Sequence, residues 1–232
     1  VTLEPPPMAM AGVGSLYSVE MYRLARSRLR EGGALSQWLP AYQIPAPLVR
    51  SAIAAFLEVF PDATLHVGEG RELLLVGHRG RAEPASLRTF EARLRERTAV
   101  AADLRSVGVE DADDLALSFA ASAERLARIA RGATPLRDDR PGLESLAAGY
   151  ARETQLPDGL LAPGEIAAWC KDCARDPELR EALAVSALLL ASEGITRHAP
   201  LAPPPSPLVL DERQRAIAMR HAALRWLVGD AP

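Results

Sequence analysis

The order of strand-like and helix-like segments in the first 80 residues narrows the possible folds more than any other feature of this sequence. Residues 1–3 are typical of the end of a strand, and residues 15–30 follow with an apolar stripe at helical spacing that ends at two glycines. Residues 34–39 form a second apolar run closed by a proline, and residues 47–60 again have helical spacing. Strands that alternate with helices predict parallel α/β units.

Two further apolar runs close this part of the chain. Residues 63–67 (ATLHV) and 72–77 (ELLLVG) are separated only by the turn-like letters GEGR. Two strands this close in sequence predict a hairpin, in which one strand is antiparallel to the other. Strand, helix, strand, helix and hairpin together predict the C-terminal half of a Rossmann-like α/β sheet of the class I methyltransferase type, over residues 1–80.

The remainder of the sequence, from residue 83 onwards, contains no convincing strand pattern. We predict an all-α region at residues 81–198 and a proline-rich linker at residues 199–210. Within the all-α region, helices are expected at residues 84–97, 142–153, 163–174 and 177–192, with shorter helical pieces up to residue 131.

A last helix is predicted at residues 211–232. Asp211 and Gln214 have the spacing of a capping box at its start. One face of this helix is apolar, so we expect it to dock on the helical region or on another chain. The apolar face consists of Ile217, Leu224, Leu227 and Val228, flanked by Trp226.

Composition argues against several classes of function. The 27 Lys and Arg residues and the 30 Asp and Glu residues nearly cancel, so the net charge of −3 does not suggest a nucleic-acid or anionic-membrane partner. The most apolar run, residues 182–191, is about half as long as the ~20 residues that a membrane-spanning helix needs. The first residues lack the pattern of a signal peptide. We therefore expect a soluble, cytoplasmic segment.

The sequence has two cysteines, Cys170 and Cys173, which are too few for a disulfide framework and indicate a reducing compartment. Their C-x-x-C spacing also occurs in redox sites and in half of a zinc site. It falls inside the helix predicted at residues 163–174, however, and not at a helix start, where the thiol pKa is lowered. No second pair completes four zinc ligands, and the four histidines are scattered, so no metal site is predicted.

Several longer stretches carry a resemblance to a known family. They are GSLYSVEMYRLARSRLREGGALSQWLPAYQ, AFLEVFPDATLHVGEG and the strand ELLLVG, preceded by LEPPP at residues 3–7 and followed by LRDDRPGLE at residues 136–144. In this order they resemble the spermidine synthase-like proteins of the polyamine aminopropyltransferase superfamily. They are most similar to its long-loop bacterial branch, which is often fused to membrane segments. The resemblance covers roughly residues 1–144.

The resemblance implies the C-terminal part of a transferase that uses S-adenosylmethionine or its decarboxylated form. The residues that grip the cofactor in such a sheet would lie in a missing N-terminal half of the parent protein, so we expect this chain alone to bind neither form. The implied partners are a small-molecule acceptor such as an amine, and a second copy of the chain in a homo-oligomer. Upstream segments would anchor such a parent in a membrane.

The resemblance also implies an acceptor site at the carboxyl ends of the strands. The family's D-x-x-D-P aligns with residues 1–5, where Glu4 takes the place of the second acid and Val1 that of the first. Its Q-x-E aligns at Gln37, with Leu39 in place of the acid. Glu4 is then the expected catalytic residue, because an ammonium must lose a proton before its nitrogen can attack.

Gln37, Tyr42 and Gln43 are the expected substrate-binding residues of this acceptor site. The departures from the family pattern leave few counter-charges for a diamine, so we expect the parent to transfer poorly to putrescine. The alternative reading of Glu4 is a solvated loop acid, and the alternatives for Tyr42 and Gln43 are a packing aromatic residue and a surface amide.

Other features allow a structural explanation beside a functional one. Gly12 and Gly14 match G-x-G, which either cradles a phosphate or forms a tight turn. Residues 137–140 (RDDR) favour a capped turn with ion pairs over a catalytic group. For the whole chain, the alternative to a transferase part is a non-catalytic protein-interaction module built on a degenerate transferase fold, in which the helical region binds a partner.

Overall fold

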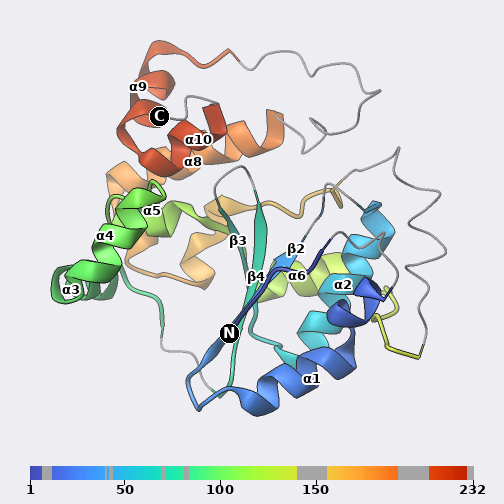
Figure 1. Ribbon diagram of the computed structural model, residues 1–232. Helices are drawn as coiled ribbons and strands as arrows, with labels where there is room; N and C mark the ends of the chain where they lie inside the picture. The colour runs from blue at the N-terminus through green and yellow to red at the C-terminus, as the bar shows by residue number, and fades with distance from the viewer. Residues whose placement is uncertain are drawn as a thin grey trace.

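A five-stranded open sheet forms the centre of this mixed α/β molecule (Figure 1). The computed structural model describes residues 1–6, 12–39, 41, 44–68, 72–80, 84–139, 156–192 and 209–228. The strand order across the sheet is β1-β2-β4-β3-β5. These strands are β1 (Thr2–Leu3), β2 (Ala34–Leu39), β3 (Thr64–Val67), β4 (Leu73–His78) and β5 (Phe119–Ala121).

The strand directions follow the sequence prediction for the first 80 residues. β1 and β2 are parallel, with Leu3 opposite Gln37. β3 and β4 form the expected antiparallel hairpin, with Leu65 opposite Leu75. β4 is also antiparallel to β2, so β1, β2 and β3 all run in one direction and β4 runs against them.

The helices α1 (Val19–Arg28) and α2 (Ala46–Val59) cover one face of the sheet together with α6 (Ala123–Ala130) (Figure 1). Their fully buried aromatic rings interlock, with the ring centroid of Phe56 4.9 Å from those of both Tyr22 and Phe60. The backbone of β4 comes so close to this layer that a Cβ atom on Gly77 would lie 2.5 Å from Phe60. The core therefore packs directly between the helices and this face.

The region after residue 83 is helical but contributes one strand to the sheet. Its elements are α3 (Leu87–Glu96), α4 (Thr98–Ser106), α5 (Ala112–Leu117), η3 (Pro163–Ala168), η4 (Cys173–Arg175), α8 (Pro177–Ser192), α9 (Glu212–Arg220) and α10 (Ala222–Val228), besides α6. The expectation that this region lacks strands is wrong, because β5 extends the sheet beyond β3. Its three residues, all fully buried, give too short a run to predict a strand from sequence.

The helix predicted at residues 163–174 is also wrong. Two short 3-10 helices, η3 and η4, occupy this stretch, and the residues between them form a turn. Cys170 and Cys173 are joined by a disulfide across that turn, with their Cα atoms 5.3 Å apart. The pair is therefore not inside one helix, since Cys170 lies between the two 3-10 helices and Cys173 begins η4, and it is not in the reduced state that the cysteine count indicated.

The last helix is present but is divided in two. The predicted capping box is confirmed, since the Gln214 amide donates to Asp211 (2.8 Å) and the Asp211 amide donates to Gln214 (3.0 Å). At His221 the backbone becomes extended, and α10 starts in a new direction. Ile217 and Leu224 are buried, and α9 and α10 pack on α8, which confirms docking on the helical region for these two residues.

Some sequence predictions fall on residues that the structure leaves undescribed. The helix expected at residues 142–153 lies outside the described residues, and so does the linker at 199–210 apart from its last two residues. Among the helices that the structure does describe, none is both long and apolar enough to cross a membrane.

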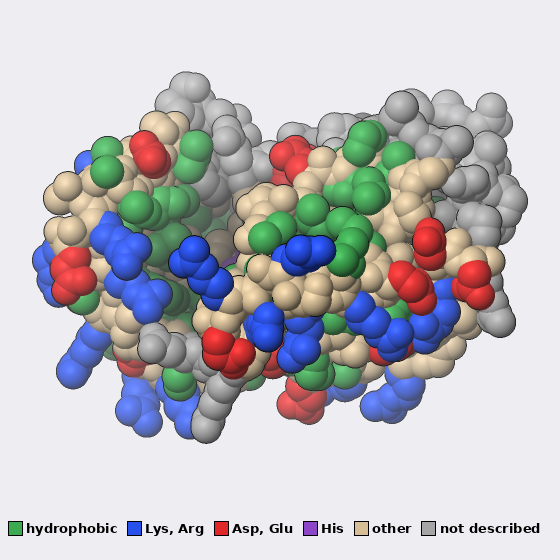
Figure 2. All heavy atoms as spheres, turned by 60° about the horizontal axis from the view of Figure 1, so that its bottom comes forward, with side chains coloured by type: hydrophobic (Ala, Val, Ile, Leu, Met, Phe, Trp, Pro, Cys, Tyr) green, Lys and Arg blue, Asp and Glu red, His purple; other side chains and the backbone are tan. Residues whose placement is uncertain are grey.

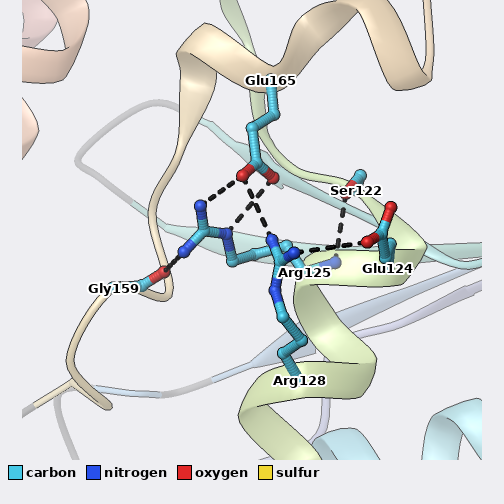
Figure 3. A network of polar contacts seen from close by, with 6 residues as sticks. All are labelled: Ser122, Glu124, Arg125, Arg128, Gly159 and Glu165. Atoms are coloured by element: carbon cyan, nitrogen blue, oxygen red, sulfur yellow. Dashed lines mark hydrogen bonds and ion pairs between the residues drawn. The ribbon is translucent and has the colours of Figure 1, made fainter.

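A polar network fastens α6 to the segment that leads into η3 (Figure 3). The Arg125 guanidinium donates from two nitrogens to the Glu165 carboxylate and from a third to the carbonyl of Gly159 (3.2 Å). Arg128 donates to Glu165 as well (3.2 Å) and pairs with Glu124 on its own helix. The hydrogen bonds from Arg125 lower the pKa of Glu165, so its charged form contributes to holding the two segments together.

Candidate functional site

The carboxyl ends of the parallel strands meet at one edge of the sheet. β1, β2 and β3 end there at Leu3, Leu39 and Val67, and β4, which runs in the opposite direction, begins there at Leu73. In open α/β sheets this is the edge at which ligands bind. The polar side chains that the fold brings to this edge are therefore the candidates for a binding site.

Glu4 lies at this edge, one residue beyond β1. It is exposed, and Leu3 before it pairs with Gln37 in the parallel register. Extending that register by one residue brings Glu4 level with Trp38 of β2. Glu4, the expected catalytic residue, therefore lies at the carboxyl end of a strand and is open to solvent.

Gln37 lies deeper than Glu4. Its side chain is 0% exposed, on the buried face of β2 that also contains Leu35 and Leu39, whereas Glu4 faces solvent. The side-chain amide donates to the carbonyl of Trp38 (2.9 Å), and its Oε1 has no hydrogen-bond partner among the described residues. A buried carbonyl without a partner costs about 1–3 kcal/mol, which singles this residue out.

Tyr42 and Gln43, the other two expected substrate-binding residues, lie outside the described residues. The Gly12 position is described. Its φ of +81° leads into the 3-10 helix η1 (Val13–Tyr17), and the Ser15 hydroxyl donates to its carbonyl (2.8 Å). This geometry favours the tight-turn explanation of the two glycines.

Glu72 is a second acid at the same edge, and the sequence analysis missed it. It directly precedes β4, and the indole nitrogen of Trp38 donates a hydrogen bond to its carboxylate. Trp38 belongs to the partly exposed face of β2. The sequence did contain a signal for Glu72. In the predicted hairpin, the strand at 73–78 runs against the parallel strands, so an acid just before it must lie at the carboxyl ends of those strands.

His66 and Ser118 form a pair that resembles part of a catalytic site, but their hydrogen bonds oppose that reading. His66 Nδ1 lies 3.1 Å from the Ser118 hydroxyl, and its Nε2 lies 2.9 Å from that of Thr64. The Ser118 hydroxyl donates its hydrogen to the carbonyl of Leu115 (2.7 Å), so it has none to give to the imidazole. Burial, together with His78, lowers the pKa of His66 to about 4, which keeps the ring neutral.

The disulfide of Cys170 and Cys173 is built into the packing of the helical region. Both cysteines are fully buried, and Asp172 between them accepts hydrogen bonds from the Ser86 hydroxyl (2.8 Å) and the Cys173 amide (3.2 Å). Burial opposes the charge of Asp172, but the hydrogen bonds from Ser86 and from amides at the start of α3 outweigh it and lower its pKa. The three residues are close enough for a metal site, but the disulfide occupies both sulfurs.

The RDDR stretch is confirmed as an ion-paired turn as far as it is described. Arg137 pairs with Glu58 (2.9 Å) and Glu20 (3.3 Å), and the Asp138 amide donates to Glu20 (3.0 Å). These contacts fasten residues 137–138 to α1 and α2, which is a structural role.

Comparison with known proteins does not extend this description. No family model, no curated protein and no solved structure matches the chain.

Proposed function

We propose that this chain supplies the acceptor side of the active site in a spermidine synthase-like transferase of the S-adenosylmethionine-dependent methyltransferase fold. The residues that hold the cofactor would lie outside it, in an N-terminal half of the parent. The strand directions support the proposal, since three parallel strands with an antiparallel hairpin strand among them match the closing half of such a sheet.

The observation that carries the proposal is the row of side chains at the carboxyl edge. Neighbouring strands lie about 4.8 Å apart, so Glu4 after β1 and Glu72 before β4 flank β2 at a separation of roughly 10 Å. Trp38 lies between them and is hydrogen-bonded to Glu72. Two carboxylates beside a half-buried aromatic ring attract a cationic amine by charge and by the cation–π interaction.

The chain's own residues then have distinct parts in the transfer. Glu4 faces solvent and has no hydrogen-bond partner among the described residues, which leaves its carboxylate available to take a proton from the acceptor ammonium. Glu72 and Trp38 hold and orient the acceptor. A bound cofactor would supply an electrophilic carbon next to its sulfonium sulfur, and the sulfur would leave as a neutral thioether as the C–S bond breaks.

The test is a transfer assay on the full-length parent, with both forms of the cofactor and a panel of amine acceptors. Glu4→Gln should lower kcat about a hundredfold or more, because the base is lost. Glu72→Gln should chiefly raise KM. Glu91→Gln is the matched control, since Glu91 is exposed on α3, away from the edge. Putrescine should be a poor acceptor.

The outcomes separate the two classes of function. A Glu4→Gln variant with an undiminished rate would remove Glu4 from the reaction. Absence of transfer to every amine, with either cofactor, would favour the non-catalytic interaction module. Rapid spermidine formation from putrescine would show that the departures from the family pattern do not exclude a diamine.

A further inference from the structure

A depression lies at the other ends of the strands, where the parallel strands begin and β4 ends. The proposed transferase reaction does not use it. Its volume is about 500 Å³, and its lining residues are Arg23, Arg26, Ser27, Glu58, Val59 and Arg79. They come from α1, from the end of α2 and from the residue that follows β4. Figure 2 looks onto the face of the molecule that contains α1, where basic side chains gather.

Three guanidinium groups line the depression against a single carboxylate, and that carboxylate is already engaged. Glu58 accepts from Arg23 (2.9 Å) and also from Arg137 outside the depression (2.9 Å). Its negative charge is therefore shared between two arginines, and positive charge remains in excess beside Arg26 and Arg79.

Arg79 is held rigidly at the rim. Its backbone exchanges two hydrogen bonds with the turn after α1, with Gly32 and Gly33 (both 2.8 Å). One nitrogen of its side chain donates to the carbonyls of Leu29 (2.7 Å) and Ser27 (3.3 Å) at the end of α1. Its Nε forms an exposed ion pair with Glu31 at 3.7 Å, which is beyond hydrogen-bond range, so donors of this guanidinium remain available to a ligand.

Arg26 lies in the last turn of α1, where its positive charge, like that of Arg28, interacts favourably with the helix dipole. This role requires only a nearby charge and does not use the N–H donors of the guanidinium, whereas Arg79 donates hydrogen bonds to the last carbonyls of the same helix. The side chain of Arg26 makes no hydrogen bond or ion pair with any described residue. An unengaged guanidinium beside a rigid one provides the forked donors that phosphate oxygens accept.

We propose that this depression binds the phosphate group of a small phosphorylated molecule, with Arg26 and Arg79 as the contacting residues. The volume lies in the range of small-molecule sites. The buried residue Val59 adds an apolar side chain to the lining, for the remainder of the ligand. The site is separate from the carboxyl edge and does not depend on the proposed transferase activity.

The experiment is isothermal titration of the complete 232-residue chain with inorganic pyrophosphate at constant ionic strength. We expect saturable binding that Arg26→Gln weakens about tenfold, the effect of one charge-assisted hydrogen bond. Arg26→Lys should retain part of the affinity. Arg28→Gln is the matched control, because Arg28 lies on the same helix and carries the same charge but does not line the depression.

Each outcome decides the proposal. Absence of saturable binding, or equal weakening by Arg26→Gln and Arg28→Gln, overturns it, since the latter would reflect only the general charge of α1. A second arm uses vesicles that contain phosphatidic acid. Binding to vesicles without binding to free pyrophosphate would assign the arginines to a membrane surface and overturn the small-molecule site.

Discussion

The α/β part of the molecule and its C-terminal helices share one apolar core, but they differ in the contacts that accompany it. In the α/β part, large apolar side chains from α1 and α2 interlock over the sheet, with Phe56 at their centre. In the helical part, Leu183, Ile217 and Leu224 belong to the same buried core, and single carboxylates in addition tie together segments far apart in sequence. Asp114 of α5 accepts from the amide of Ala223 in α10 (3.0 Å), and Asp172 accepts from Ser86 at the start of α3.

This difference has a consequence for mutations. Apolar burial is spread over many contacts, and its loss scales with the volume removed. A buried carboxylate concentrates its effect in one residue, whose loss leaves backbone amides without a partner. Both parts should therefore respond to truncation of their core side chains, and the helical part should respond in addition to the removal of individual carboxylates.

The largest expected effect tests the apolar side of the comparison. Phe56→Ala should lower the free energy of unfolding by about 3–5 kcal/mol, because it leaves a cavity between Tyr22 and Phe60. Leu24→Ala on α1 is the control, since Leu24 is 55% exposed and its truncation should cost under about 0.5 kcal/mol. Urea denaturation measures both. Similar values for the two variants would mean that the α2 core does not hold this part together.

The second-largest expected effect is a pH dependence of stability at the boundary between the two parts. There, His66 of β3 contacts Ser118 and the ring of Trp169. Burial lowers the pKa of His66 from about 6.5 to about 4. The unfolded chain therefore takes up this proton at a higher pH than the folded protein does. The contribution of neutral His66 to the free energy of unfolding is therefore complete above pH 6.5. As the pH falls towards 4, the free energy of unfolding should decrease by about 2–3 kcal/mol.

Denaturation of His66→Asn over this range of pH measures that effect. The variant should lose most of the slope between pH 6.5 and 4, whereas His221→Asn should retain it. An unchanged slope in His66→Asn would assign the pH dependence to other groups.

A smaller effect tests the polar side of the comparison. Asp114 is 2% exposed, and its carboxylate accepts from the amides of Ala223 and Glu110 (2.9 Å). Burial raises its pKa, and the two amides offset this in part. Asp114→Asn places a donor against one amide and should cost about 2 kcal/mol.

Hydrogen exchange of the α10 amides locates that effect. Protection of α10 should fall in Asp114→Asn more than protection of β4. Asp113→Asn, whose carboxylate accepts no hydrogen bond among the described residues, should leave both unchanged. Equal loss in α10 and β4 would contradict a separate polar fastening of the C-terminal helices.

The smallest effect concerns the network around Glu165. Glu165→Gln should cost about 0.5–1 kcal/mol at neutral pH, because the partners are partly exposed to solvent. The pKa of Glu165 is lowered in the folded protein, so its contribution is present at neutral pH and disappears as the pH falls below its usual value of 4.5. The difference in melting temperature between wild type and variant should therefore vanish in acid. A constant difference would exclude the ion pairs as its source.

Local patterns in the sequence determined most of the α/β part and the start of the last helix. The alternation of apolar residues predicted β2, β3 and β4 and the helices between them, because one buried face imposes a spacing of two or 3.6 residues. The hairpin followed from its short loop, and the capping box from the spacing of Asp211 and Gln214. These features depend on residues near one another in the chain.

The tertiary structure decided what depends on residues far apart. β5 is too short to be predicted by its pattern and is a strand because β3 offers it an edge. α10 begins where it does because Asp114, 109 residues earlier, accepts a hydrogen bond from its first turn. The hydrogen bond between Trp38 and Glu72 joins residues 34 positions apart, and Arg26 and Arg79 share a depression only once β4 ends beside α1. Such contacts leave no periodic trace in a sequence, because no repeat of 2 or 3.6 residues relates their partners.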